Sequence, residues 1–187
     1  SAAQKIGTEI PFTVVLRDSG GNSYGQSGGV LAVTSSPAGV TIANQVDNGD
    51  GSYTFTASSA ARGTFELSAS VGSVDLDASP QARFTEVDPG TTTVSPSSLV
   101  VVVGSPETVF VTLREVDGIF VGHGGHSVTV ASTFIDSLGI VPAPAVSDNG
   151  DGTYTLTQSC TVAIGAADTV TVLVDGVSVG SYSLDCD

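Results

Sequence analysis

The sequence contains no methionine, no tryptophan and no long hydrophobic run, and it has only five lysine and arginine residues together. Because 19 aspartate and glutamate residues stand against those five basic residues, the formal net charge is −14. A chain with so few basic residues cannot neutralise a phosphate backbone or an anionic lipid surface, so we expect neither nucleic-acid binding nor membrane contact. The longest aliphatic run, residues 99–103, is far too short to cross a bilayer.

Charged residues make up only 13% of the 187 residues and hydrophobic residues 40%, which is opposite to the composition of disordered chains. Valine, threonine, serine and glycine are abundant, whereas the helix formers lysine and methionine are scarce or absent. This composition favours strands over helices. Because the chain does not begin with methionine, we expect it to be a processed or excised piece of a longer protein.

An internal repeat organises the chain. Residues 46–56 (Val-Asp-Asn-Gly-Asp-Gly-Ser-Tyr-Thr-Phe-Thr) return as residues 147–157 (Ser-Asp-Asn-Gly-Asp-Gly-Thr-Tyr-Thr-Leu-Thr), at an offset of 101. Upstream, residues 12–18 match residues 109–115 at an offset of 97. The difference predicts an insertion of four residues in the second copy, between Thr133 and Ala145, where two prolines indicate an irregular loop.

The duplication predicts two domains, residues 1–88 and residues 89–187. We expect the boundary near residues 87–90 (Val-Asp-Pro-Gly), because proline ends strand pairing and glycine permits a change of direction. Both copies show period-two alternation of apolar and polar residues, which is typical of half-buried strands. It occurs at residues 12–17, 53–58 and 65–71 and again at 109–113, 154–157 and 170–174. Short strands separated by glycine-rich turns predict antiparallel β-sandwiches.

These segments resemble filamin-type immunoglobulin-like repeats. The resemblance rests on the Asp-Asn-Gly-Asp-Gly hairpin followed by Ser/Thr-Tyr-Thr, on Phe-Thr-Val-Val-Leu-Arg-Asp at residues 12–18, on residues 63–69 and on the Val-Asp-Pro-Gly exit. Bacterial invasin/intimin-type immunoglobulin-like repeats are a second, weaker resemblance. The implied fold is all-β, with two tandem immunoglobulin-like (filamin-type) antiparallel β-sandwiches.

The two copies differ in two respects. Residues 91–104 supply a full first strand, strand A, to the second copy, whereas residues 1–7 leave little room for one in the first. We therefore expect the first domain to lack a full first strand. The second copy also has no equivalent of Ser79-Pro80, so its last strand is expected to run straighter.

The only cysteines are Cys160 and Cys186. An even count in an apolar, lysine-poor chain fits a disulfide in an oxidising compartment, with two buried free thiols as the alternative. In a sandwich whose strands alternate in direction from A to G, strands E and G run the same way. Cys160 would end strand E and Cys186 strand G, so both would lie at one pole, and we predict that they form a disulfide. The first copy has Ser59 in place of Cys160.

We find no sequence signature of an active site and predict that the chain is not an enzyme and binds no cofactor or metal. Three patterns have a metal-binding alternative: His123 with His126, the hairpin at residues 47–51, and Glu86 with Asp88 at the domain boundary. A polar loop and a hairpin turn explain the first two without a metal. Arg17 and Arg114 occupy equivalent strand positions, and we expect each to pair with a neighbouring carboxylate.

The resemblance also implies a partner-binding surface, because filamin-type repeats often accept an extended segment along strand C, beside strand D. Edge strands accept such segments through their unpaired backbone groups. The alternative is that these edges are covered or blunted. The strand C residues of the two copies are Val30, Leu31, Ala32 and Val33, and Val128, Thr129 and Val130.

These patterns together predict an extracellular or cell-surface structural segment that acts as a rigid spacer or as a building block of a filament or surface assembly. One alternative is an adhesion or receptor module that binds a partner segment by strand addition, and another is a cytoskeletal cross-linker repeat. We expect protein partners or self-association, including donation of a strand to the exposed strand B edge of the first domain by a preceding repeat or a neighbouring subunit.

Overall fold

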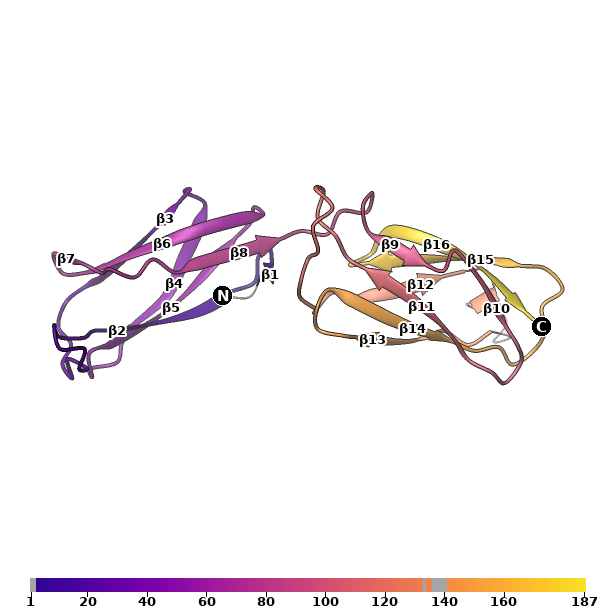
Figure 1. The fold of residues 1–187 in the computed structure, drawn as a ribbon, viewed down its shortest axis with the longest axis horizontal. Helices are drawn as coiled ribbons and strands as arrows, with labels where there is room; N and C mark the ends of the chain where they lie inside the picture. The colour runs from indigo at the N-terminus through magenta and orange to yellow at the C-terminus, as the bar shows by residue number, and fades with distance from the viewer. Residues whose placement is uncertain (1–2, 133, 136–140) are drawn as a thin grey trace. The chain divides into compact units, whose positions relative to one another are not determined.

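A computed structural model describes residues 3–132, 134–135 and 141–187, and strands account for nearly all of its regular structure (Figure 1). The chain divides into two compact units, Ser1–Thr85, called domain 1 below, and Glu86–Asp187, called domain 2. The division lies three residues before the boundary expected from the sequence. Among the described residues, no helix has the length and apolar character that a membrane span requires.

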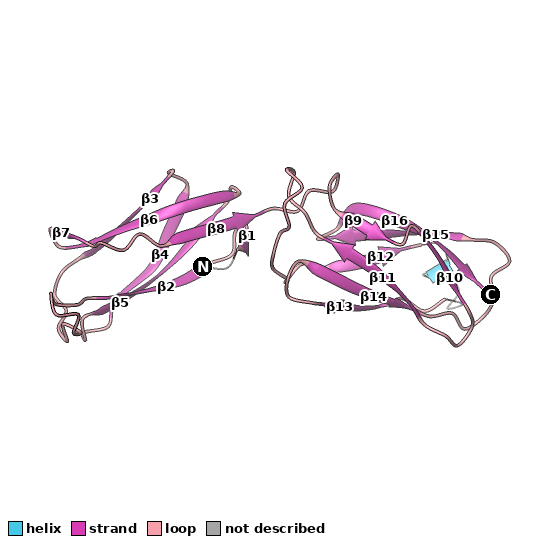
Figure 2. Ribbon diagram, in the orientation of Figure 1, coloured by secondary structure: helices cyan, strands magenta, loops and turns pink. Residues whose placement is uncertain are grey.

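Domain 1 contains two sheets. One has the strand order β1-β8-β6-β3, with β7 paired to β6, and the other has the order β2-β5-β4. The strands are drawn as magenta arrows in Figure 2. Their bounds are β1 (Gln4–Lys5), β2 (Ile10–Val15), β3 (Leu31–Ser36), β4 (Val40–Asp47), β5 (Ser52–Ser59), β6 (Gly63–Val71), β7 (Val74–Asp75) and β8 (Gln81–Thr85).

Domain 2 also contains two sheets, with the strand orders β13-β14-β11-β9 and β10-β16-β15-β12. Neighbouring strands are antiparallel except β10 and β16, which are parallel, as β1 and β8 are in domain 1. The bounds are β9 (Thr93–Ser95), β10 (Ser98–Val101), β11 (Glu107–Thr112), β12 (Val128–Ala131), β13 (Ala145–Asp148), β14 (Thr153–Gln158), β15 (Asp168–Val174) and β16 (Val177–Cys186).

The strand orders are those of immunoglobulin-like sandwiches. In domain 2, β9, β11, β14 and β13 take the places of strands A, B, E and D, and β12, β15 and β16 those of C, F and G. Domain 1 repeats this arrangement with β2, β5 and β4 opposite β3, β6 and β8. The all-β fold with two immunoglobulin-like sandwiches is therefore confirmed, and every alternating segment predicted from the sequence overlaps a strand.

The first strand of domain 2 differs from the prediction. One strand was expected within residues 91–104, but the structure has β9 paired with β11 on one sheet and β10 paired with β16 on the other. Pro96 lies between them, and because proline has no N–H it cannot continue a ladder. In domain 1 the described residues contain β1, the counterpart of β10, and no counterpart of β9. The expected lack of a full first strand stays a prediction.

The last strand is divided in domain 1 but not in domain 2. There β16 spans ten residues, with a register shift against β15 between Val172 and Leu173. In domain 1 the equivalent segment is divided into β7 and β8, and residues 76–80, which include Ser79 and Pro80, lie between the two. The side of domain 1 on which these residues lie is therefore less regular than the matching side of domain 2.

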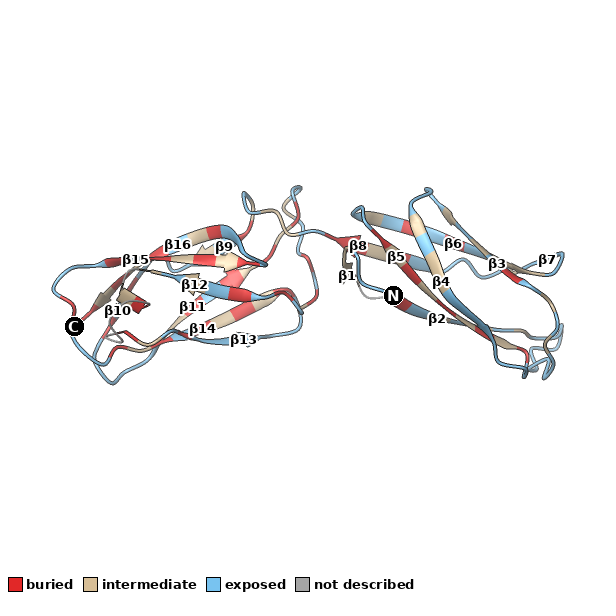
Figure 3. Cartoon of the chain, turned by 180° about the vertical axis from the view of Figure 1, so that it is seen from behind, coloured by how far each residue is buried: buried red, intermediate tan, exposed pale blue. Residues whose placement is uncertain are grey.

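Each domain has its own apolar core, made by every second residue of its strands, which faces inward. Figure 3 shows buried positions alternating with more exposed ones along the strands, as the sequence pattern predicts. On β5 the inward residues are Tyr53, Phe55 and Ala57, and on β14 they include Tyr154 and Leu156. The predicted insertion between Thr133 and Ala145 falls in part on residues 133 and 136–140, which lie outside the described residues, while Ile135 and Val141 pack in the domain 2 core.

The predicted disulfide between Cys160 and Cys186 is confirmed. Both side chains are buried in the domain 2 core, and their Cα atoms are 5.9 Å apart. Cys186 ends β16, while Cys160 lies two residues beyond the end of β14 rather than within it. In domain 1 the equivalent Ser59 is also buried, and its hydroxyl donates to the carbonyl oxygens of Gly39 and Ala61 at 3.0 and 2.9 Å.

Replacing both cysteines by serine should destabilise domain 2 alone. The bond closes a loop with a sequence separation of 26 residues. In the chain-entropy model such a loop stabilises the folded state by roughly 3.5 kcal/mol, which the double variant should lose. Chemical unfolding of the oxidised chain and of the Cys160→Ser/Cys186→Ser variant measures this loss, with the domain 1 transition as internal control. An unchanged domain 2 transition would contradict the assignment.

Candidate functional site

The predicted strand C residues lie at sheet edges in both domains. Among the residues that the structure describes, β3 pairs with β6 alone and β12 with β15 alone, so each ends its sheet. Val30 precedes β3 and is 80% exposed, whereas Leu31 and Val128 point into the cores. Ala32, Val33, Thr129 and Val130 lie on the same two strands. Partner binding along these edges stays a prediction.

Domain 1 has a further edge on its other sheet. That sheet has the order β2-β5-β4, so among the described residues β2 pairs with β5 on one side and with no strand on the other. We call this unpaired side the free edge of β2. The matching strand in domain 2, β11, is paired on both sides, with β14 and β9. The two copies of the repeat therefore differ in how strand B is covered.

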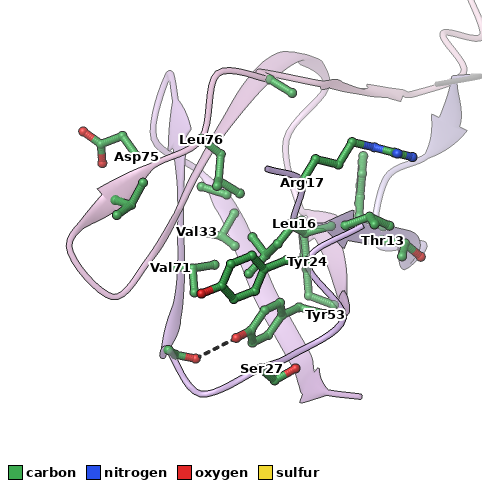
Figure 4. Close-up of a pocket in the computed structure, with 18 of the residues that line it drawn as sticks. Thr13, Leu16, Arg17, Tyr24, Ser27, Val33, Tyr53, Val71, Asp75 and Leu76 are labelled. Carbon is green, nitrogen blue, oxygen red and sulfur yellow. Dashed lines mark hydrogen bonds between the residues drawn. The ribbon is translucent and has the colours of Figure 1, made fainter. Parts of the chain in front are cut away.

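An apolar groove of about 880 Å³ lies beside β2. Residues 12–17 form one side, residues 74–78 and Pro80 form the other, and Tyr24 and residues 26–29 close one end. Figure 4 shows Leu16, Val33, Val71 and Leu76 beside Tyr24, whose side chain is 62% exposed. Tyr53 lies beneath them and donates a hydrogen bond to the carbonyl oxygen of Gly29 at 3.1 Å.

The two histidines lie in a hydrogen-bonded cluster at one end of domain 2. The rings of His123 and His126 stack at 5.2 Å, and Nδ1 of His126 lies 2.8 Å from Oδ2 of Asp175. The backbone N–H of His126 donates to the hydroxyl of Tyr154 at 2.8 Å, and that hydroxyl donates to Asp148 at 3.3 Å. Burial raises the pKa of Tyr154 to about 12. The cluster thus ties three loops together.

No group of three or more histidine, cysteine, aspartate or glutamate side chains within the described residues has the arrangement of a metal site. The carboxylates of the two Asp-Asn-Gly-Asp-Gly hairpins are engaged by their own turns. Asp47 accepts from the N–H of Gly49 at 2.9 Å, and Asp148 accepts from the N–H of Gly150 at 2.8 Å. Asp50 and Asp151 accept from the residues two positions later in the same way. A hairpin turn accounts for these residue types.

Arg17 and Arg114 have backbone partners in the structure, and their expected pairing with carboxylates stays a prediction. Arg17 donates to the carbonyl oxygen of Gly21 at 2.8 Å, and Arg114 donates to that of Gly118 at 2.7 Å. Arg114 also stacks over the ring of Phe120. Each side chain therefore closes its own loop through a carbonyl oxygen four residues ahead.

Sequence reasoning identified the free edge of β2 but not the groove beside it. The signal was available in Ser79-Pro80, since a proline in the last strand indicates that this wall departs from regular pairing. The contact between His126 and Asp175 was also missed. It joins residues 49 positions apart, and nothing in the local pattern of either residue indicates the other.

No family model matches the chain, and no curated protein matches it. Among solved structures it is similar to the Escherichia coli adhesin FdeC (17% identity, TM-score 0.49, covering 100% of this chain and 62% of that one). It is also similar to invasin, a bacterial integrin-binding protein (20% identity, TM-score 0.47, covering 99% of this chain and 37% of that one). A third similar structure is the Lin-41 filamin domain (14% identity, TM-score 0.43, covering 55% of this chain and 98% of that one). The chain thus spans less than two thirds of the first two.

Asp148 should make domain 2 sensitive to acid. The N–H of Gly125 donates to its carboxylate at 2.7 Å and is the largest of the contacts that hold the pKa of Asp148 below its usual 3.8. Because the folded pKa is lowered, this stabilisation is present above about pH 4 and is lost as the pH falls through the folded pKa.

The variant Asp148→Asn keeps an acceptor for Gly150 but removes the charge that Gly125 contacts. We expect it to lower the free energy of unfolding of domain 2 by about 0.5–1 kcal/mol at pH 7, a range reduced for solvent screening, and to flatten its acid dependence. Chemical unfolding between pH 2 and pH 7 tests this. Asp47→Asn, the equivalent change in domain 1, is the matched control and should leave the domain 2 transition unchanged. Equal acid profiles for Asp148→Asn and the unmodified chain would contradict the prediction.

Proposed function

We propose that the chain is a non-enzymatic module of an extracellular or cell-surface protein, in which it serves as a spacer or as a building block of a surface assembly. The buried Cys160–Cys186 disulfide carries this proposal. Disulfides of this kind form and persist in oxidising compartments and are rare in the cytosol. The bond closes one end of domain 2, where it protects the last strand from fraying.

The surface and the repeat support the same role. The acidic surface keeps the strands soluble and opposes edge-to-edge sticking. Residues 1–88 contain 4 basic and 9 acidic residues, and residues 89–187 contain 1 and 10, so both domains are acidic. Two copies of one sandwich joined in a single chain suit a spacer, because length grows by adding copies while each copy keeps its own core.

The second candidate is an adhesion or receptor module that captures a partner segment by strand addition. The edge positions of β3 and β12 and the free edge of β2 favour it, because within the described residues each strand has a neighbour on one side alone. A cytoskeletal cross-linker is the least favoured role, because the disulfide would be reduced in the cytosol.

Location can be tested in the source organism. Antibodies against domain 2 should label intact, unpermeabilised cells or particles. Protein recovered after blocking free thiols should show Cys160 joined to Cys186 in a non-reduced peptide map. Labelling only after permeabilisation, together with free thiols, would exclude the extracellular role.

Spacer and adhesion roles can be separated by replacement in the full-length protein. An unrelated pair of immunoglobulin-like domains of similar length should restore function if the segment is a spacer. The same replacement should abolish attachment or assembly if the segment binds a partner. Point variants on β3 and β12, such as Val30→Glu and Thr129→Glu, would then identify the binding edge, and the exposed Val100→Glu provides a control away from those edges.

A further inference from the structure

Each domain contains one asparagine that is followed by glycine, Asn48 in domain 1 and Asn149 in domain 2. Both lie in the same five-residue sequence, Asp-Asn-Gly-Asp-Gly, at residues 47–51 and 148–152. Asparagine is a thermolabile residue, and a following glycine leaves its backbone nitrogen uncovered because it has no Cβ atom. Since the local sequence is the same in both copies, a difference in the reactivity of the two asparagines comes from the fold around them.

The reaction open to such a pair is a ring closure followed by hydrolysis. The backbone nitrogen of the glycine loses its proton to solvent and attacks Cγ of the asparagine side chain. The new bond replaces the bond from Cγ to Nδ2, which leaves as ammonia, and a five-membered succinimide remains. Water then opens the ring to aspartate or isoaspartate, so one water is consumed for each ammonia released. The reaction therefore needs a glycine N–H that can be deprotonated and an asparagine side chain that can turn toward it.

The backbone of the two hairpins is the same. In each, the N–H of the asparagine donates to the carbonyl oxygen four residues ahead, at 3.0 Å in domain 1 and 3.1 Å in domain 2. The glycines that follow, Gly49 and Gly150, have φ angles of 80° and 81°. Backbone geometry therefore does not distinguish the two asparagines, whereas the side-chain contacts around each hairpin do.

The glycine nitrogen is held by the aspartate that begins each hairpin. Its N–H donates to Asp47 at 2.9 Å in domain 1 and to Asp148 at 2.8 Å in domain 2. The carboxylate of Asp148 is also anchored from outside the hairpin, by the N–H of Gly125 at 2.7 Å and the hydroxyl of Tyr154 at 3.3 Å. Asp47 has no such second anchor within the described residues. A hydrogen bond to a carboxylate opposes loss of the glycine proton, and an anchored carboxylate maintains that bond better than an unanchored one.

The side chain of Asn149 is also held by more contacts than that of Asn48. Its Nδ2 atom donates to the hydroxyls of Thr153 and Thr155 at 3.0 and 3.2 Å. Nδ2 of Asn48 donates to the hydroxyl of Ser52 at 2.9 Å, its one such contact among the described residues. Each bond has to break before the side chain can turn to the glycine nitrogen, and one hydrogen bond changes the population of the freed side chain by about two- to tenfold.

We propose that Asn48 is a site of spontaneous deamidation in the folded chain, with water as the co-reactant, and that the anchored Asp148 and the two threonine hydroxyls protect Asn149. Conversion adds one negative charge to domain 1, and the isoaspartate product inserts a methylene group into the backbone between β4 and β5. Aged protein should therefore lose the regular hairpin of domain 1 and keep that of domain 2. The proposal concerns the chemistry of the chain and does not depend on the proposed function.

The test incubates the oxidised 187-residue chain at mildly alkaline pH and follows both asparagines by mass spectrometry of its peptides. Asn48 should react at least about threefold faster than Asn149, the difference expected from one hydrogen bond. In denaturant, where these contacts are absent, the two rates should be similar. Equal rates in the folded chain, faster reaction of Asn149, or a preference for Asn48 that persists unchanged in denaturant would overturn the proposal.

Two variants test the role of the anchored carboxylate. Asp148→Ala removes the acceptor of the glycine N–H and should raise the rate at Asn149 at least about threefold, while the rate at Asn48 stays the same. Asp148→Asn keeps an oxygen acceptor for Gly150 and should retain most of the protection. An unchanged rate at Asn149 in Asp148→Ala would overturn the proposed protection.

The disulfide variant separates local protection from the stability of the whole domain. Cys160→Ser/Cys186→Ser should destabilise domain 2 without touching the hairpin, because Cys160 lies beyond the opposite end of β14. The rate at Asn149 should therefore stay slow in this variant under conditions in which it remains folded. If it rises as much as in Asp148→Ala, deamidation follows unfolding of the domain and the proposed protection fails. The comparison of Asn48 with Asn149 in the native sequence needs no variant, so the proposal stays testable if Asp148→Ala does not fold.

Discussion

Backbone pairing along strand B decides how completely each sandwich is closed. In domain 2, β11 is hydrogen-bonded to β14 on one side and to β9 on the other, and its inward residues are fully buried in the core. In domain 1 only β5 pairs with β2 among the described residues, and the same inward positions stay half-buried. Buried backbone groups require partners, so the side chains behind a strand that is paired on one side stay closer to water than those behind a strand paired on both.

Much of the fold could be predicted because the repeat appears twice. Alternation located β2, β5 and β6, and the duplicated hairpin fixed the two D–E turns, because glycine and asparagine tolerate the backbone angles that such turns need. Topology predicted the disulfide, since strands E and G run in the same direction and their ends meet. These features depend on local pattern and strand direction, which a sequence records directly.

The remaining features depend on contacts that the local pattern does not record. Strand A of domain 2 divides between two sheets, and neither half is distinctive enough to show it. A buried hydrogen bond links the hydroxyl of Tyr182 to Gln158 at 3.2 Å, where domain 1 has alanine at both equivalent positions, 57 and 82. Polar residues in a core require hydrogen-bond partners, and here each of the two supplies the other's partner. Only the three-dimensional pairing identifies them as partners.

The disulfide also determines how tension would pass through domain 2. The covalent path from Asp187 runs through Cys186 and across the sulfur bridge to Cys160, so it bypasses β15 and β16. When domain 2 unfolds under tension, the segment between the two cysteines, with its sequence separation of 26 residues, does not extend, because the disulfide holds its ends together. At about 3.5 Å per extended residue, it withholds roughly 90 Å of chain. Reduction would release that length and turn a short, stiff extension into a longer, more compliant one.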